Sequence, residues 1–392
     1  MALAAAMTAT HGASLDVELQ DLQGPGWTAR GIRASLSDIG ATQVGVRVTV
    51  EELSLPEPLG AVEHAALECK QLQFTSRYVS CESGTMKIDH STLQTIAGPV
   101  SFHYQFGGPL EATFKDLNLA GGQATGRLEW NAPQWRIELT AGGVQALSVA
   151  NTLTNIFPAL GYAAEGAVAI TARLDGNTDG IGGVDLAADT STLSFSNEQS
   201  THAGEALDSR LTLVAKKRAD AWQFGSTLEL RKGQLYIDPV FVEAKDQPLA
   251  LQAIGEWSVK SRRLDIDRMS LDHPGVLQTS GNFTLSADGP ARVDSLTLNA
   301  TDATLPGAYE SYLRPFLIGT PLDDLETAGE LRGSVSLGGD RKSMNLTLAD
   351  VSVDDKQNRF GLYDINGAVN WHDQETPQSS VISFDGGRLY SV

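Results

Sequence analysis

Apolar and polar residues alternate with a period of two along most of the chain. The stretch ATGRLEWNAPQWRIELTAG places Leu128 and Trp130 on one face, and Ile137 and Leu139 on one face after a turn at Pro133. Such alternation is typical of half-buried strands, whose successive side chains point to opposite faces of a sheet. The sequence therefore predicts many strands separated by turns.

The same alternation continues through the second half of the chain. Where it slips, as between Leu348 and Val351, we expect bulges or turns. The fold class that follows is mainly β, an elongated and curled antiparallel sheet. Apolar positions of these later runs include Leu228, Leu230, Leu235, Ile237, Val240, Val242, Leu264, Ile266, Met269, Leu271, Met344, Leu346 and Leu348.

Two segments show helical spacing instead. ALSVANTLTNIFPALG predicts a short amphipathic helix near 146–160, and LPGAYESYLRPFLIG predicts another near 306–318. Pro158 and Pro315 fall late in these segments, where proline kinks or ends a helix. The two apolar helix faces comprise Val149, Leu153, Ile156, Phe157 and Leu160, and Tyr309, Tyr312, Leu313, Phe316 and Leu317.

The surroundings of the two helical segments are related. Each has a strand, the helix, a Gly-marked strand start, a strand and a Gly-rich turn, and Gly166 corresponds to Gly329 at an offset of 163 residues (329 − 166). We infer a β-rich segment over 15–126, a first module over 127–290 and a second, truncated module over 291–392. Because the sequence stops within the strand pattern GGRLYSV, we expect it to be part of a longer protein.

The first 14 residues, MALAAAMTATHGAS, leave two interpretations open. They resemble the tail of a signal sequence or anchor, or they are a frayed terminus, since a basic start is lacking. Nowhere does an apolar run approach the ~20 residues of a transmembrane helix.

Charge excludes one class of partner. The formal net charge is −19, and an acidic protein is repelled by nucleic acid phosphates and by anionic membrane surfaces. The longest basic run, Lys216-Lys217-Arg218, is followed by Ala-Asp-Ala and has the character of a solvated hairpin end. We therefore expect no nucleic acid partner.

One stretch, LDGNTDGIGGVDL at 174–186, begins like a calcium loop. Asp175, Asn177 and Asp179 sit two apart and Gly180 follows, as in loops that gather oxygen ligands around one cation. The twelfth position, which must supply a bidentate acid, is Leu186. A hairpin turn is therefore favoured over a weak calcium site.

Other catalytic or metal-binding patterns are not found in the sequence. The histidines show no paired metal-ligand spacing, and neither a nucleophile elbow nor a phosphate-binding loop is present. Asp323 and Asp324 could flank a sugar in a glycan hydrolase, but a solvated turn is the simpler interpretation. We expect neither an enzyme nor a resident cofactor or metal. The histidines are His11, His64, His90, His103, His202, His273 and His372.

The two cysteines, Cys69 and Cys81, flank an alternating stretch with a turn in it. Neighbouring strands would bring the sulfurs within bonding distance. In an exported protein the pair is expected to be a disulfide, and in a cytosolic one two thiols. We favour the disulfide.

A sheet of this length must cover its apolar face, and only two short helices are on hand. The sheet either packs a dry core against itself or stays open as an apolar channel suited to acyl chains.

The strands AEGAVAITARLDG and AGELRGSVSLGGD after amphipathic helices, the hairpin DLNLAGGQATGRLEW and the pair CKQLQFTSRYVSC resemble the AsmA-like and YdbH-like proteins of Gram-negative envelopes. These belong to the repeating β-groove lipid-transfer proteins. The resemblance implies a periplasmic protein, anchored to the inner membrane, whose groove conducts phospholipid to the outer membrane. It also implies membrane-anchored or outer-membrane partner proteins.

On this hypothesis the groove is lined by apolar strand residues and capped by the two helices. The alternatives are a structural or adhesin-like β-body with a dry core, and an enzyme on a β scaffold. The expected lining is Leu128, Trp130, Ile137, Leu139, Leu228, Leu230, Leu235, Ile237, Leu346 and Leu348, and the expected caps are Leu153, Ile156, Phe157, Leu160, Tyr312, Leu313, Phe316 and Leu317.

Overall fold

The computed structural model describes residues 13–24, 27–39, 44–54, 61–90, 94–156, 161–245, 247–287, 292–338, 342–373 and 379–389, with side chains for all of these except 152–156, 300 and 301. Its 24 strands are assigned to one sheet, and the strand pairs are antiparallel. The mainly-β prediction is thus confirmed. The chain divides into two compact units, with the division falling inside two successive strands between residues 160 and 184. The module boundaries expected near 127 and 291 stay predictions.

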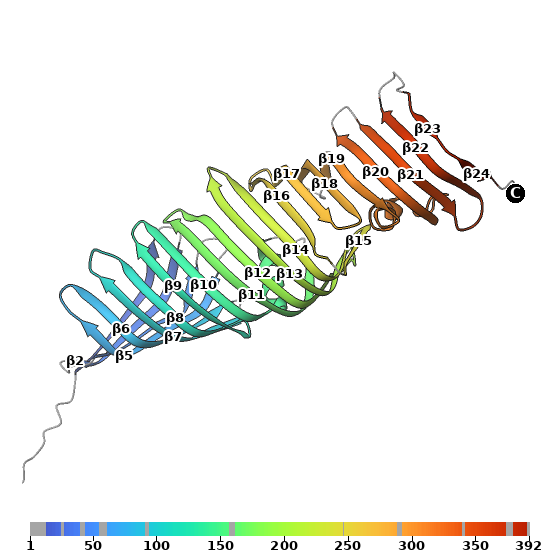
Figure 1. Cartoon of the computed structure of the whole chain (residues 1–392). Coiled ribbons are helices and arrows are strands. Elements are labelled where there is room, and N and C mark those ends of the chain that lie inside the picture. Colours follow the sequence, from blue (N-terminus) through green and yellow to red (C-terminus); the bar gives the residue numbers. More distant parts are fainter. Residues whose placement is uncertain are drawn as a thin grey trace, which may run out of the picture. The chain divides into compact units, whose positions relative to one another are not determined.

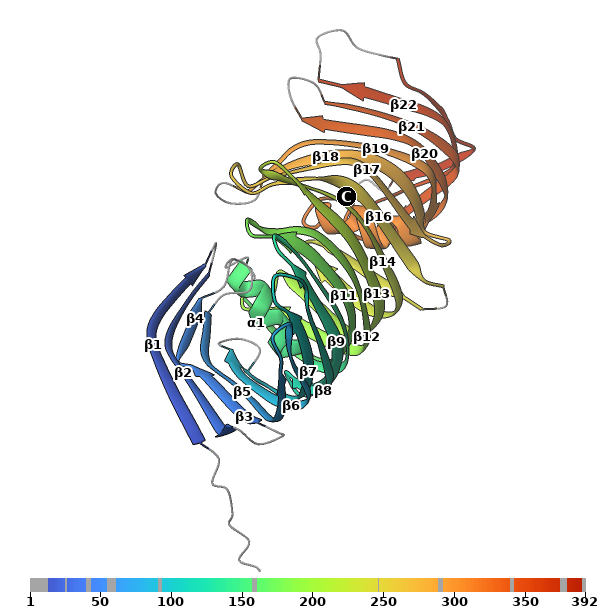
Figure 2. The ribbon, with the colours of Figure 1, turned by 90° about the vertical axis from the view of Figure 1, so that its left-hand side faces the viewer.

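The first unit is built of successive hairpins (Figure 1). Its elements are β1 (Ala13–Gly24), β2 (Trp27–Ile39), β3 (Val44–Val50), β4 (Glu52–Ser54), β5 (Ala61–Phe74), β6 (Tyr78–His90), β7 (Gln94–Gln105), β8 (Leu110–Leu119), β9 (Gly122–Asn131), β10 (Gln134–Gln145), α1 (Ala146–Ile156) and most of β11 (Tyr162–Asn177). Figure 2 shows α1 inside the curve that these strands form.

The second unit repeats the hairpin arrangement and carries its own helical segment. Its elements are most of β12 (Gly180–Asn197), β13 (His202–Arg218), β14 (Ala221–Ile237), β15 (Val240–Ala244), β16 (Leu249–Ser258), β17 (Arg263–His273), β18 (Leu277–Ser286), β19 (Arg292–Leu305), η1 (Tyr309–Leu313), η2 (Arg314–Phe316), β20 (Leu325–Gly338), β21 (Ser343–Asp355), β22 (Phe360–His372), β23 (Val381–Ser383) and β24 (Gly386–Leu389).

The two helical segments form where the sequence predicts them, with one difference. α1 begins at Ala146 as expected. The second segment is a π-helical turn, η1, followed by a 3-10 turn, η2, instead of a regular α-helix. Pro315 accounts for the change, since it lacks the N–H that would continue the helix and its ring crowds the preceding turn.

Residues with positive φ interrupt neighbouring strands at matched places in the second unit. Thr192 of β12 has φ 52° and Ala206 of β13 has φ 50°. The Thr192 N–H donates to Asp208 Oδ1 at 2.9 Å, and the Ala206 N–H donates to Ser194 Oγ at 3.2 Å. Each residue with positive φ therefore donates to a polar side chain on the neighbouring strand, two residues after the positive-φ residue of that strand.

The same arrangement recurs 158 residues later (350 − 192), in β21 and β22. Asp350 has φ 50° and Asp364 has φ 54°. The Asp350 N–H donates to Asn366 Oδ1 at 3.0 Å, and the Asp364 N–H donates to Ser352 Oγ at 3.2 Å. Bulges bend a strand and increase its twist, so paired bulges curve the sheet where they lie. The slip expected between Leu348 and Val351 is confirmed as a register shift.

Gly329 of β20 approaches this second bulge closely. Its φ is 105°, and a Cβ atom there would lie 2.5 Å from the Asp350 carbonyl oxygen. We predict that Gly329→Ala lowers the free energy of unfolding by about 2–3 kcal/mol, because strain and a backbone clash combine.

The matched control is Gly319→Ala, where φ is 80° but nothing lies within 4 Å of the added atom. It should cost only about 1 kcal/mol. Urea unfolding midpoints measure both variants, and equal losses would show that the close approach to Asp350 contributes nothing.

The calcium-like loop is a hairpin turn, as predicted. β11 ends at Asn177 and β12 begins at Gly180. The Asp179 N–H donates to Asn177 Oδ1 at 2.7 Å, so the asparagine side chain stabilises the turn.

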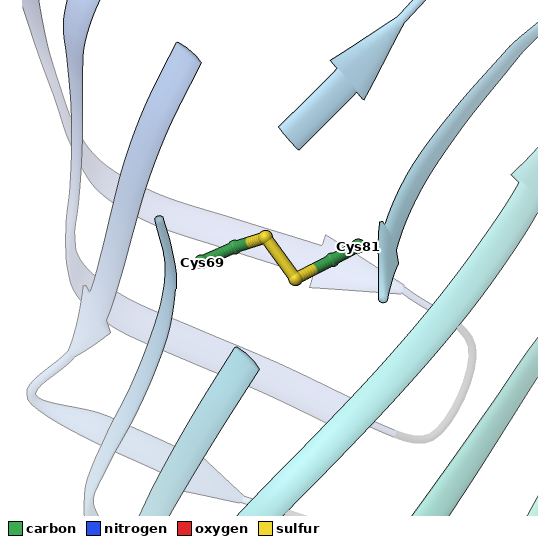
Figure 3. Close-up of a disulfide and its surroundings, with 2 residues drawn as sticks. All are labelled: Cys69 and Cys81. Carbon is green, nitrogen blue, oxygen red and sulfur yellow. A yellow bond between two sulfur atoms is a disulfide. The ribbon is translucent and has the colours of Figure 1, made fainter. Parts of the chain in front are cut away.

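Cys69 of β5 and Cys81 of β6 form a disulfide, which confirms that prediction (Figure 3). Their Cα atoms lie 6.2 Å apart, and both residues are buried with Leu72. Val46, Val79 and Phe102 pack around them. The bond therefore lies inside a small apolar cluster of the first unit.

Removal of the disulfide by the double change Cys69→Ala and Cys81→Ala should lower the free energy of unfolding by about 2–3 kcal/mol, since it closes a short loop. Urea unfolding with and without a reductant measures the loss. The reductant should lower the midpoint of the wild-type chain and leave the variant unchanged. A wild-type midpoint that does not respond to complete reduction would contradict the prediction.

Candidate apolar binding face

Directly paired residues on antiparallel strands share a face of the sheet, so the register shows where apolar side chains line up. In the first unit one row runs from Ala112 through Leu128 and Ile137 to Leu174. The next row towards the β9–β10 turn contains Trp130. The predicted lining residues of this unit thus fall on one face.

α1 packs on this same face. Val149 of α1 contacts a buried cluster that includes Ala124, Ala141 and Val144, and Leu139 packs at the margin of that cluster. The concave side seen in Figure 2 is therefore the apolar side. The predicted cap residues Leu153 and Ile156 have no described side chains, and Phe157 and Leu160 lie outside the described residues.

The second unit has apolar rows of the same kind. Leu211, Leu228, Leu251 and Leu271 are paired in turn across β13, β14, β16 and β17. In the later strands, Leu346 pairs with Gly333 and Val369, and Leu348 with Leu331 and Gly367. A further row consists of Leu298, Val335, Met344 and Trp371.

The opposite faces carry cross-strand ion pairs. In the first unit Arg47 contacts Glu68 at 3.0 Å, and Arg127 contacts Glu111 at 3.1 Å. In the second unit Arg332 contacts Asp302 at 3.2 Å. Exposed ion pairs contribute at most about 1 kcal/mol each to stability. Their main effects are to make this face hydrophilic and to favour the observed strand register.

Much of the apolar face is not covered by the chain. Trp130, Leu337 and Trp371 expose 39%, 42% and 47% of their surface, and Leu128, Leu228 and Leu346 are only half-buried. These exposed and half-buried side chains form the uncovered part of the apolar face.

The second helical segment covers one end of the apolar face of its unit. Tyr309 is buried among Ala303, Leu325 and Val351, and Leu317 packs beside them. The Tyr309 hydroxyl donates to the Leu322 carbonyl at 2.7 Å.

Tyr312 reaches a second cluster, and its hydroxyl lies 3.0 Å from His273 Nδ1. Burial raises the pKa of Tyr312 to about 12 and lowers the pKa of His273. Both residues therefore stay uncharged near neutral pH, and the contact serves to hold the segment in place.

Two predicted cap residues do not cover the face. Leu313 and Phe316 expose 43% and 65% of their surface. The π and 3-10 turns change the angular spacing that a regular helix would give, so these two side chains leave the common stripe.

Asp355 and Arg359 fasten the loop after η2. Two guanidinium nitrogens of Arg359 donate to the buried Asp355 carboxylate at 2.8 Å each, and a third contact reaches the Pro321 carbonyl at 3.1 Å. The side-chain hydrogen bonds from Arg359 lower the pKa of Asp355 to about 2. The ion pair thereby ties the β21–β22 turn to the helical cover.

We predict that Asp355→Asn lowers the urea midpoint at pH 7 and that its deficit shrinks in acid. The folded pKa of about 2 lies below the ordinary 3.8, so the stabilisation is complete above about pH 4 and is lost as pH falls through 2. Urea titrations between pH 6 and 2 test this. The control is Asp324→Asn, since Asp324 lies on the loop after η2 and forms an exposed ion pair with Lys356 of the β21–β22 turn. A deficit independent of pH would contradict the assignment.

The remaining predicted lining residues differ in exposure. Leu230 is buried at 2% exposure, Leu235 is half-buried, and Ile237 exposes 50% at the end of β14. Sequence reasoning missed Leu211 and Leu251, which pair with Leu228, and Val369, which pairs with Leu346. These residues alternate as clearly as the predicted ones, but no single strand reveals the register.

Within the described ranges, no group of three or more His, Cys, Asp or Glu is placed to hold a metal ion. No helix in the described part of the chain is long and apolar enough to cross a membrane. A shallow depression of about 560 Å³ lies at the β9–β10 turn beside Trp130 and Trp135.

Comparison with family models, curated proteins and solved structures found no match to this chain.

Proposed function

We propose that this protein binds phospholipid by its acyl chains on the apolar face of the sheet and supports lipid transport between the two membranes of a Gram-negative envelope. The observation that carries the proposal is the uncovered apolar face, whose rows are continuous across strands in each unit. Each CH₂ group moved from water onto such a face contributes roughly 0.8 kcal/mol.

The contrast between the two faces favours an amphipathic ligand over a second protein layer. Arg47, Arg127 and Arg332 keep the outer face charged, whereas the inner face offers leucines at strand spacing. An acyl chain is flexible and apolar along its length, so it can follow a curved face that supplies no hydrogen-bond partners. The headgroup then stays in water.

The disulfide supports an oxidising compartment. Cys69 and Cys81 are bonded within a buried cluster, and such bonds persist mainly in exported proteins. The periplasm, with anchoring to the inner membrane in a longer protein, is the location that we propose.

A structural β-body with a dry core is the alternative. The clusters beneath α1 and η1 are buried apolar clusters of limited extent. They leave residues such as Trp371 and Leu337 exposed, so we rank this alternative second.

The test is native mass spectrometry of the purified chain with lipid extraction from the same sample. Leu228→Glu with Leu251→Glu changes a directly paired, half-buried couple in the middle of the face. We predict that the wild type carries phospholipid and that the amount of lipid bound to this variant is lower by about tenfold or more. The reason is that two carboxylates would lose their water on contact with the acyl chain.

Thr227→Glu with Gln252→Glu is the matched control. These residues are also paired, one position along each strand, and therefore lie on the opposite face. This variant should keep its lipid, and circular dichroism should show both variants folded. A lipid-free wild type, or a folded inner-face variant with undiminished lipid, would overturn the proposal.

A further inference from the structure

All six tryptophans lie near strand ends, and five of them lie at the ends opposite those from which α1 or η1 leaves the sheet. In the second unit η1 leaves the sheet from the end of β19, which we call the helix edge. Trp222 is the second residue of β14 and Trp257 is next to last in β16. Both lie at the opposite strand ends, which we call the tryptophan edge.

These two tryptophans form one row with a lysine. Trp222 pairs directly with Trp257 on one side and with Lys217 on the other. Phe224 lies one row further in and pairs with Ala215. Lys217, Trp222 and Trp257 therefore close the apolar face where it meets water. A lysine stem can lie on apolar surface while its ammonium group reaches solvent.

The two turns at this edge are basic in an acidic chain. Residues 216–224 and 255–265 contain six Lys or Arg and three Asp or Glu, against a net charge of −19 for the chain. Lys260 is paired with Asp220 and Arg263 with Asp265. Within the described ranges, Arg218 takes part in no ion pair.

The first unit provides a contrast. Trp130 and Trp135 are also paired at the edge opposite the start of α1, but Arg127 and Arg136 there are balanced by Glu129 and Glu138. The positive excess therefore distinguishes the Trp222–Trp257 pair from the Trp130–Trp135 pair.

The helix edge of the second unit is closed. Leu230 and Leu249 are paired, 2% and 5% exposed, and buried in the cluster that Tyr312 contacts. From Trp222 to Leu230 the strand spans about 26 Å, whereas one acyl chain occupies about half of the roughly 30 Å hydrocarbon core of a bilayer. An acyl chain that lies along these strands and points its apolar end towards the closed edge fits within this length. Its polar end then lies on the side of the tryptophan edge.

We propose that the tryptophan edge of the second unit seats the phosphate-bearing headgroup of the lipid, with Lys217 contacting the phosphate and Trp222 and Trp257 packing at the junction of headgroup and chain. Indoles favour such junctions because one part of the ring system is apolar and the N–H remains polar. The assignment rests on the proposed function and adds an orientation and a headgroup charge to it.

The orientation is tested by fluorescence of a variant that keeps only Trp222 and Trp257, the other four tryptophans being changed to Phe. The probes are phosphatidylglycerol brominated at carbons 6 and 7, near the headgroup, and at carbons 11 and 12, near the chain end. We expect the first lipid to quench emission at least about twofold more strongly, since bromine acts at short range. Equal or reversed quenching, with binding confirmed by mass spectrometry, overturns the orientation.

The headgroup charge is tested with Lys217→Ala. The matched control is Lys216→Ala, which removes the same charge from the outer face, where Lys216 is paired with Gln223. Lys217→Ala should weaken binding of phosphatidylglycerol about tenfold and leave diacylglycerol with the same chains unaffected. Lys216→Ala should change neither.

The outcomes separate the two proposals. Equal effects of the two variants, or equal losses for both lipids with Lys217→Ala, would overturn the phosphate contact. Displacement of the lipid by millimolar glycerol phosphate would instead assign a site for free phosphates and overturn the headgroup assignment. A wild-type chain that binds neither lipid would remove the proposed function itself.

Discussion

An antiparallel sheet in a single layer has an apolar face that must be covered, and most features of this protein follow from that constraint. Rows such as Leu211, Leu228 and Leu251 are continuous because paired residues share a face. The opposite face is kept in water by ion pairs such as Arg47 with Glu68. Since α1 and η1 cover only part of the apolar side, part of it remains exposed. Exposure of this apolar surface to water is unfavourable in free energy, and a bound ligand would remove that cost.

Curvature decides where the chain covers its own face. The reciprocal bulges at Thr192 and Ala206, and again at Asp350 and Asp364, bend neighbouring strands at matched positions. The bulge at Asp350 adjoins Val351, which belongs to the cluster around Tyr309. Local irregularity thus brings the sheet against the helical segment at one end, while the regular stretches between bulges keep their side chains half-exposed.

The strands could be read from the sequence because alternation is a local signal, as Leu128 and Trp130 or Ile137 and Leu139 illustrate. The slip after Leu348 was equally visible. The register between strands was not visible in the sequence. The pairing of Trp222 with Trp257 depends on how two strands align, and the alternation within either strand fits several alignments equally well. The π-helical turn was missed because Pro315 changes hydrogen bonding in a way that apolar spacing alone does not reveal, and Leu313 and Phe316 consequently left the predicted stripe.

Net charge and local charge have different consequences in this chain. A charge of −19 would repel an anionic lipid from most of the surface. Lys216-Lys217-Arg218, which in sequence is only a solvated hairpin end, acquires another meaning once Lys217 is found in register with Trp222 on the apolar face. Repulsion elsewhere then favours approach at this one edge, because an anion is attracted only where cations exceed acids. An overall acidic protein can in this way orient an acidic lipid better than a uniformly basic one.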